Sequence, residues 1–450
     1  MKNLWAREDA DIFFNQVRRL GISRQFADCV YASRLLGLEV QLVQHGGGNT
    51  SVKLLAKTVD ETPIEAMFIK ASGYNLDQIT VEGFVGVNQS SLDRLKTHTN
   101  ISDEVLINAL GQSRLSFSSP NPSVETFLHA FLPFKFVDHT HADAILNVTN
   151  RPEGFKLCNN IFGDKVALVP YVMPGFMLAK KVYEIYSKNP KINCLILMNH
   201  GIFTFANNAK DAYSLMIKYV SKAEKTIKKL KVKKIRQIKK FSTKFQPYEI
   251  APIIRGLLSN NQPDQKFIVN YKINKYLQYF TNGKNVRTYS SRGTATPDHV
   301  IRVKPFPLII TPKKNSTIND FKLIAEKAFK NYRKKYVNYF NVNKKKVKGK
   351  KIMLDTSPRV ILVQNVGMFS VGKDLKSAKI AGDLTETNAR VISSVEETST
   401  YKFIPEKDLF DVEYWSLEQA KIKKTKKILE GNVVVITGST GTIGFETYKL

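Results

Sequence analysis

Two histidines one residue apart, His139 and His141, interrupt the otherwise apolar residues 137–146. Successive side chains of a β-strand alternate between its two faces, so both imidazoles of such a pair can reach one ion. Imidazole suits zinc, which makes the pair a candidate metal clamp. A pair of this kind is also common as a structural or exposed feature, so its meaning depends on the rest of the chain.

Two further residues strengthen the metal interpretation. His200 ends the apolar residues 192–199, and three protein ligands with one open position are typical of catalytic zinc sites. Glu125 is expected on the first turn of a helix among apolar neighbours, where a partly desolvated carboxylate can serve as ligand or general base. The alternative is a glutamate that only stabilises the helix dipole. His129, four residues further on, is expected to contact the site or the core rather than the metal.

Two glycine-containing segments could bind an anion: HGGGNTSVK at residues 45–53 and KASGYNL at residues 70–76. Glycines free the backbone to point N–H groups at an anion, and hydroxyl and amide side chains add donors. Neither segment is a Walker motif, and a triple glycine is often only a flexible hairpin. Beside a metal, such a nest suits a phosphorylated ketose. The expected substrate-binding residues are Gly48, Asn49, Thr50, Ser72, Gly73 and Ser123.

The elements that position these residues alternate between helix and strand, and the pattern partly repeats. Residues 195–212 resemble residues 360–378: an apolar strand, Gly-x-Phe, a polar turn and a helix. Aligning Gly201 on Gly367 places Val366 opposite His200. A weaker match aligns PDHVIRV (residues 297–303) with VDHTHAD (residues 137–143). Asp298 and His299 then correspond to Asp138 and His139. Ile301 takes the place of His141. If this repeat is not a chance likeness, catalysis belongs to the first copy alone.

Residues 429–450 form a different unit. Residues 433–436 predict a buried strand, Gly438, Gly441 and Gly444 a turn, and a helix is expected to begin near Ile443. A glycine turn between strand and helix favours a dinucleotide pyrophosphate. The acidic ribose-binding residue expected about 20 positions later would lie past residue 450. We therefore expect the opening of a Rossmann domain that binds no NAD stably by itself.

The composition limits the class of protein. The 450 residues carry a formal net charge of +30, with lysines clustered at residues 228–240 and 343–351. These clusters lack interleaved aromatic residues, which favours a solvated basic face over a nucleic-acid site. The three cysteines show no CxxC spacing, and no signal peptide or apolar run of about 18 residues occurs. We expect a cytoplasmic enzyme, a homo-oligomer, with neither nucleic acid nor membrane as partner.

The motifs GGGNTS, ASG, PSVE, HTHAD and MNHG occur in the order of the class II aldolase/adducin-head family, which this chain resembles. The segments YASRLLG, ATPDHVIR and DLFDVEYWSLEQAK are similar to bifunctional members that join a rhamnulose-1-phosphate aldolase to a short-chain alcohol dehydrogenase. The resemblance implies an α/β fold in three parts. These are a three-layer aldolase sandwich (residues 1–238), a second α/β unit and linker that is a candidate degenerate repeat (residues 239–427), and a Rossmann fragment (residues 428–450).

By this resemblance His139, His141 and His200 are zinc ligands, and Glu125 is the catalytic acid/base. Asn49, Ser72, Gly73 and Ser123 would hold mainly the substrate phosphate. The implied reaction is the zinc-dependent retro-aldol cleavage of a ketose 1-phosphate, similar to rhamnulose 1-phosphate, to dihydroxyacetone phosphate and lactaldehyde. NAD(P) would bind at Gly438, Gly441 and Gly444 only in a complete dehydrogenase domain. The family's tyrosine proton donor has no identified counterpart here. The alternatives are a pentulose-phosphate 4-epimerase or another metal-dependent sugar-phosphate lyase, and a non-catalytic adducin-like binding head.

Overall fold

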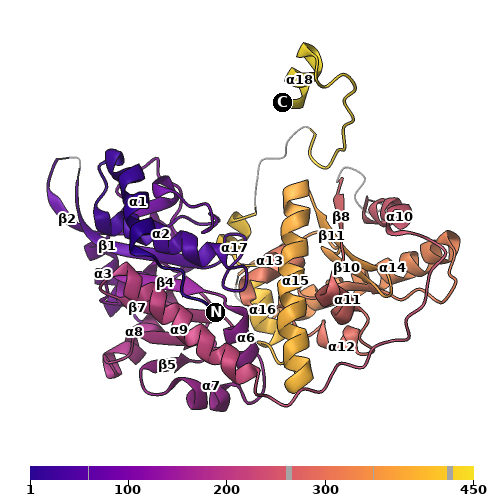
Figure 1. Cartoon of the computed structure of the whole chain (residues 1–450), viewed down its shortest axis with the longest axis horizontal. Helices are drawn as coiled ribbons and strands as arrows, with labels where there is room; N and C mark the ends of the chain where they lie inside the picture. The colour runs from indigo at the N-terminus through magenta and orange to yellow at the C-terminus, as the bar shows by residue number, and fades with distance from the viewer. Residues whose placement is uncertain (59, 260–265, 348, 423–428, 450) are drawn as a thin grey trace.

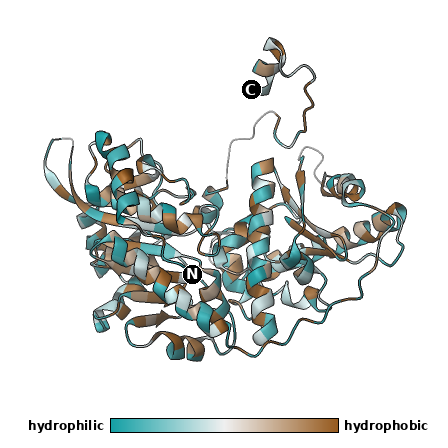
Figure 2. Cartoon of the chain, viewed as in Figure 1, coloured by the Kyte–Doolittle hydropathy of each residue, from teal (hydrophilic) through white to brown (hydrophobic). Residues whose placement is uncertain are grey.

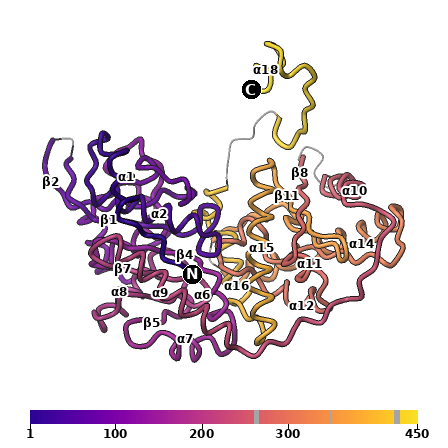
Figure 3. Tube along the Cα trace, viewed as in Figure 1, coloured from indigo at the N-terminus to yellow at the C-terminus, as the bar shows by residue number. Residues whose placement is uncertain are grey.

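The computed structural model describes residues 1–58, 60–259, 266–347, 349–422 and 429–449. Two α/β domains lie side by side, each built around its own β-sheet (Figure 1). Residues 228–246 lead from the first domain to the second along the lower edge of the molecule in the view of Figure 3. The candidate ligands of the sequence all fall in the first domain, so its sheet determines how they meet.

The first sheet has seven strands in the order β3-β2-β1-β4-β7-β6-β5. Neighbouring strands are antiparallel, except that β5 and β6 are parallel. The strand β4, which carries the histidine pair, therefore lies in the centre of the sheet. The strand bounds are β1 Asn49–Lys57, β2 Pro63–Lys70, β3 Phe84–Asn88, β4 Phe136–Thr140, β5 Val166–Val169, β6 Cys194–Leu197 and β7 Gly201–Ala206.

Helices cover both faces of this sheet and complete a three-layer sandwich, as the sequence predicted. Alternation divides the strand residues between two cores: Phe136 packs into one and Val137 into the other. The first face is covered by α1 Arg7–Val17, α2 Arg24–Leu38, α6 Asp143–Thr149, α7 Gly154–Phe162 and α9 Ala209–Ile227. The second face is covered by α3 Gln89–Asp93, α4 Asp103–Ser113, α5 Thr126–Phe131 and α8 Phe176–Lys188.

The second domain is the expected second α/β unit, with four strands in the order β8-β11-β10-β9. It also buries a core on each face, with Leu362 in one and Ile361 in the other. Its strands are β8 Ile268–Lys272, β9 Leu308–Ile310, β10 Val360–Val363 and β11 Gly367–Gly372. Its helices are α10 Pro247–Ser259, α11 Lys275–Thr281, α12 Val286–Tyr289, α13 Val300–Val303, α14 Ile318–Asn343, α15 Leu375–Thr398, α16 Glu406–Glu413 and α17 Ser416–Ala420.

The four strands of the second sheet repeat the order and directions of β4-β7-β6-β5 in the first. The strand register also agrees with the sequence alignment. Phe203 lies opposite Leu195 in the first sheet, and Phe369 lies opposite Ile361 in the second. Since Gly201 and Gly367 occupy matching positions, Val366 stands in the turn position that His200 has in the first domain.

The predicted match of Asp298-His299 to the first histidine of the pair is wrong. His139 pairs with Phe203 across β4 and β7, and Tyr271 pairs with Phe369 across β8 and β11, so Tyr271 is the counterpart of His139. Asp298 and His299 instead lie in a short 3-10 turn, Pro297–His299. Proline has no N–H to donate to a sheet, so Pro297 favours this turn over a central strand.

The prediction of a buried strand at residues 433–436 is also wrong. These residues form no regular structure, and the side chain of Val435 is 87% exposed. A strand needs a hydrogen-bonding neighbour, and none of the described strands pairs with this segment. Figure 2 shows its apolar residues standing apart from both domains. Gly438 does adopt a left-handed turn, with φ of 66°, before the helix α18 Thr442–Lys449, which begins one residue ahead of Ile443.

Candidate metal centre and substrate pocket

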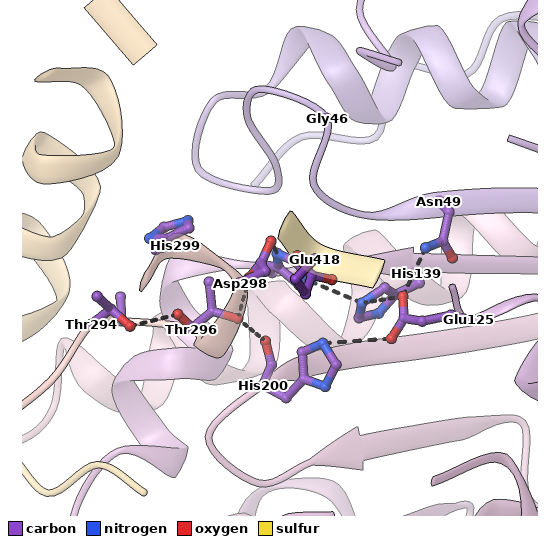
Figure 4. Close-up of polar contacts among 12 residues, drawn as sticks. Gly46, Asn49, Glu125, His139, His200, Thr294, Thr296, Asp298, His299 and Glu418 are labelled. Atoms are coloured by element: carbon purple, nitrogen blue, oxygen red, sulfur yellow. Dashed lines mark hydrogen bonds and ion pairs between the residues drawn. The ribbon is translucent and has the colours of Figure 1, made fainter. Parts of the chain in front are cut away.

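The register of three strands gathers the candidate residues at one end of the first sheet (Figure 4). Asn49, the first residue of β1, lies opposite His139 in β4. On the other side of β4, Thr140 lies opposite Ile202, close to the start of β7. The glycine segment before β1, the histidine pair at the end of β4 and His200 before β7 are therefore neighbours.

The three histidines predicted as ligands face one another. Their candidate ligand atoms lie within 4.8 Å of each other, and all three side chains are buried. The Nε2 atoms of His139 and His141 are 3.0 Å apart. His139 is held in place because its ring stacks on Phe203, with centroids 4.0 Å apart, and its Nδ1 lies 3.0 Å from the carbonyl oxygen of Ile202.

The protonation of these rings indicates that a cation belongs between them. The carbonyl of Ile202 can only accept a hydrogen bond, so the Nδ1 of His139 carries the proton and its Nε2 presents a lone pair. The Nδ1 of His141 faces a carboxylate oxygen of Asp298 at 3.5 Å, which favours the same tautomer. Burial lowers the pKa of His139 to about 4 and that of His141 to about 3, so both rings are neutral at neutral pH. Two facing lone pairs repel unless a metal ion lies between them, and the donor set suits zinc.

Glu125 points its carboxylate at this cluster. Its Oε2 lies 3.3 Å from the Nε2 of His139, and its Oε1 lies 3.5 Å from the Nε2 of His200. The residue is 6% exposed and immediately precedes α5, and its Oε1 has no hydrogen-bond partner in the part of the chain that the structure describes. Burial raises the pKa of Glu125, but the neighbouring imidazoles and a hydrogen bond from Asn49 lower it by a larger amount, so the resulting pKa is about 2. The carboxylate is therefore ionised and free on one oxygen.

A chain of hydrogen bonds orients Glu125. The side-chain amide of Asn49 donates to Glu125 at 2.7 Å and to Ser123 at 3.0 Å, and its oxygen faces the Nε2 of His129. The other ring nitrogen of His129 lies 2.8 Å from the hydroxyl of Ser51. His129 thus supports Asn49 and lies outside the set of ligands. Asn49 acts on the carboxylate directly.

The two predicted anion-binding segments meet beside this cluster. Gly46 and Gly48 have φ values of 78° and 57°, and a Cβ on Gly48 would lie 2.6 Å from the carbonyl oxygen of His139. Any residue with a Cβ would collide with this carbonyl oxygen, so only glycine can occupy position 48. The buried ammonium of Lys70 donates to the carbonyl oxygens of Gly46 and Tyr74 and so ties the two segments together. Burial lowers the pKa of Lys70 to about 7.

The pocket between these segments and the histidines contains all but one of the predicted substrate-binding residues. Thr50 is the exception, because alternation along β1 turns it to the opposite face of the sheet from Asn49. Its hydroxyl lies 2.7 Å from that of Ser33 in the core. The lining residues are Gly46, Gly47, Gly48, Asn49, Lys70, Ser72, Gly73, Ser123, Val124, Glu125, His141, Pro174, His200, Asp298, Glu418 and Lys421.

Three lining residues come from the second domain and were missed in the sequence. Asp298 follows Pro297 in the 3-10 turn, Glu418 lies on α17, and Lys421 follows that helix. The Lys421 ammonium donates to Glu418. Asp298 belongs to the incorrect repeat alignment, and Glu418 and Lys421 belong to the motif DLFDVEYWSLEQAK of the resemblance. Nothing local in them indicated that they reach the first domain.

The comparisons with known proteins identify the class. Residues 27–226 match the family profile described as class II aldolase and adducin N-terminal domain, and residues 245–422 match that described as aldolase class II, second domain. The chain therefore belongs to the class II aldolase/adducin family, whose aldolases are lyases.

The chain is also similar to particular proteins. The chain is 30% identical over 458 aligned residues to the uncharacterized oxidoreductase YuxG of Bacillus subtilis, covering 99% of this chain and 64% of that protein. It is 39% identical to the N-terminal class II aldolase domain of a Thermoplasma acidophilum protein, covering 50% of this chain and 99% of that one, with a TM-score of 0.45. The L-fuculose-1-phosphate aldolase of Thermus thermophilus is 16% identical, covering 45% and 95% of the two chains, with a TM-score of 0.30. The chain thus spans less than two thirds of the length of its curated relative.

None of the described helices is both long and apolar enough to cross a bilayer.

The histidine cluster predicts that His139→Ala removes the metal. The variant loses one imidazole ligand and also the ring that stacks on Phe203, so bound zinc should fall from about one per chain to near zero. Elemental analysis after dialysis against a weak chelator measures this. His98→Ala, which changes an exposed histidine outside the pocket, is the matched control. Full zinc content in His139→Ala would show that the site has been assigned incorrectly.

Proposed function

We propose that the chain is a zinc-dependent aldolase that cleaves a ketose 1-phosphate, similar to rhamnulose 1-phosphate, into dihydroxyacetone phosphate and lactaldehyde. The observation that carries the proposal is the convergence of the imidazoles of His139, His141 and His200 on the carboxylate of Glu125. Three imidazoles leave a bound cation with an open position, and the carboxylate beside them has one oxygen without a hydrogen-bond partner among the described residues.

The pocket supports a phosphorylated substrate. Left-handed glycines shape one wall, and the hydroxyls of Ser72 and Ser123 lie in the same lining. Of the two lysines in the lining, Lys70 uses two of its three N–H donors on backbone carbonyls, and burial lowers its pKa to about 7. We therefore assign the contact with the anion to Lys421. Burial lowers the pKa of Lys421, but the charges of Glu418 and Asp298 raise it more, so the ammonium stays charged.

The proton balance of the reaction requires one acid/base group. Cleavage of the bond between C3 and C4 takes a proton from the C4 hydroxyl and leaves the electron pair on C3, which must then be protonated. A divalent cation, when bound, supplies Lewis-acid stabilisation of the negative charge. Glu125 is ionised, is held in place by Asn49 and faces the cluster, so we assign it the transfer of this proton to C3.

A pentulose-phosphate 4-epimerase could use the same metal and acid/base residues, and an adducin-like head would need neither. The likeness to an oxidoreductase favours the aldolase, because an oxidoreductase part would oxidise or reduce the aldehyde released. The histidine cluster favours an enzyme over a binding head.

Product analysis tests the proposal. Zinc-loaded protein incubated with a panel of ketose 1-phosphates should release dihydroxyacetone phosphate and an aldehyde, both measurable in coupled assays. The metal-free protein is the control. Conversion of a pentulose phosphate to its C4 epimer without release of aldehyde would identify the epimerase instead. Binding to anionic lipid or nucleic acid without zinc would favour the binding head.

The role of Glu125 predicts that Glu125→Gln loses activity and keeps its metal. The amide oxygen still accepts from Asn49, but the group no longer takes up a proton, so kcat should fall by a factor on the order of 10²–10⁴. Steady-state kinetics and zinc analysis on the same preparation separate the two effects. A kcat within threefold of the parent would remove Glu125 from the catalytic role.

The charge in the pocket predicts that Lys421→Met weakens substrate binding. Losing a charge-assisted hydrogen bond should raise KM for the ketose phosphate by about tenfold, with a smaller change in kcat because the phosphate does not react. Lys421→Arg should recover part of the loss. Exposed Lys210 on α9 provides the control Lys210→Met. An unchanged KM in Lys421→Met would place the phosphate elsewhere.

A further inference from the structure

Residues 294–299 of the second domain lie directly against the candidate metal ligand His200 (Figure 4). Asp298 of this segment also faces a second candidate ligand, His141. The hydroxyl of Thr296 lies 3.1 Å from the carbonyl oxygen of His200 and also 3.1 Å from Oδ1 of Asp298. Thr296 is fully buried, and the hydroxyl of neighbouring Thr294 donates to its carbonyl oxygen at 2.8 Å. The backbone of His200 and the carboxylate of Asp298 are thus joined through one side chain.

The second oxygen of this carboxylate faces the other ligand. Oδ2 of Asp298 lies 3.5 Å from the Nδ1 of His141, and the Asp298 side chain is 22% exposed at the edge of the pocket. Among the described residues, Asp298 is the only carboxylate that lies within ion-pair distance of a ring nitrogen of His141.

The ring of His141 has no comparable support from its own domain. Among the described residues, the one polar group that faces its Nε2 is the nitrogen of His139, which presents a lone pair of its own. Gly47 approaches the Nδ1 side closely, since a Cβ on Gly47 would lie 3.2 Å from that nitrogen, but glycine offers no side-chain acceptor. Asp298 is therefore the group able to fix which nitrogen of His141 carries the proton.

We propose that Asp298 is a positioning residue of the metal centre: it accepts the Nδ1 proton of His141, directs the Nε2 lone pair toward the ion, and makes metal affinity depend on the second domain. A carboxylate behind a ligating histidine fixes the tautomer and orientation of the ring and raises its basicity. This inference rests on the proposed zinc site and adds the second domain to it. Thr296 links the same carboxylate to the backbone of the third ligand.

The test measures metal affinity in the full chain. Zinc is titrated against a chromophoric chelator, and cobalt(II) absorption reports the geometry of the site. Asp298→Ala should bind zinc 10- to 100-fold more weakly than the parent and shift the cobalt bands. Asp298→Asn should lose less, because its amide oxygen can still accept from His141. Thr296→Val leaves the carboxylate without its hydroxyl partner. The zinc affinity of this variant should lie between those of Asp298→Ala and the parent.

A matched control separates positioning from folding. Glu396 is a partly buried acid of the same domain that pairs with Arg292 away from the pocket, so Glu396→Gln should leave zinc affinity unchanged. Thermal unfolding monitored by circular dichroism identifies any variant that fails to fold. If the alanine variant does not fold, the near-isosteric asparagine variant still decides through its weaker binding and shifted cobalt bands.

The outcomes distinguish this inference from the proposed function. Zinc affinities of Asp298→Ala and Asp298→Asn within twofold of the parent would overturn the positioning role while leaving the aldolase proposal intact. A parent that binds zinc and shows the expected losses but cleaves no ketose phosphate would support the positioning role and defeat the proposed reaction. A parent that binds no zinc would overturn both.

Discussion

The site depends on the position of one short strand. β4 lies between β1 and β7, and its register sets Asn49 opposite His139 on one side and Ile202 opposite Thr140 on the other. A shift of one residue would turn both histidines of the pair to the opposite face of the sheet. The close packing of Gly48 on the carbonyl of His139 leaves the register little freedom.

The electrostatics of the pocket follow from this convergence. The imidazoles of His139 and His141 remain neutral, and the carboxylate of Glu125 remains ionised. The pocket lining also contains the carboxyl groups of Asp298 and Glu418 and the amino groups of Lys70 and Lys421. Burial raises the pKa of Glu418 and lowers that of Lys70 to about 7, which reduces the charge on each. A divalent cation beside Glu125 would offset the negative charge of that buried carboxylate.

The two domains contribute unequally to this chemistry. The four strands of the second sheet repeat the order of β4-β7-β6-β5 in the first. In the second sheet, however, Tyr271 and Val366 occupy the positions of His139 and His200. That sheet therefore cannot form a matching cluster of imidazoles. Its domain acts on the first through turns and helix ends, with Asp298 and Lys421 reaching across the interface. Further contacts hold the domains together, including an ion pair between Arg390 on α15 and Asp143 on α6.

The sequence by itself determined what depends on local spacing. Strand alternation placed His139 and His141 on one face of the sheet. The glycine turns and the expected helix at Glu125 located the other first-domain residues of the site. Thr50 is the exception, because alternation along β1 turns its side chain into the core. Only the tertiary structure decided which residues close the pocket, because Asp298, Glu418 and Lys421 approach it through domain packing, which leaves no periodic signal in a chain. The predicted match of Asp298-His299 to the histidine pair was wrong for a similar reason. A few identical residues do not distinguish a strand from a turn. Residues 433–436 show the converse, an apolar run that predicts a strand but finds no described strand to pair with.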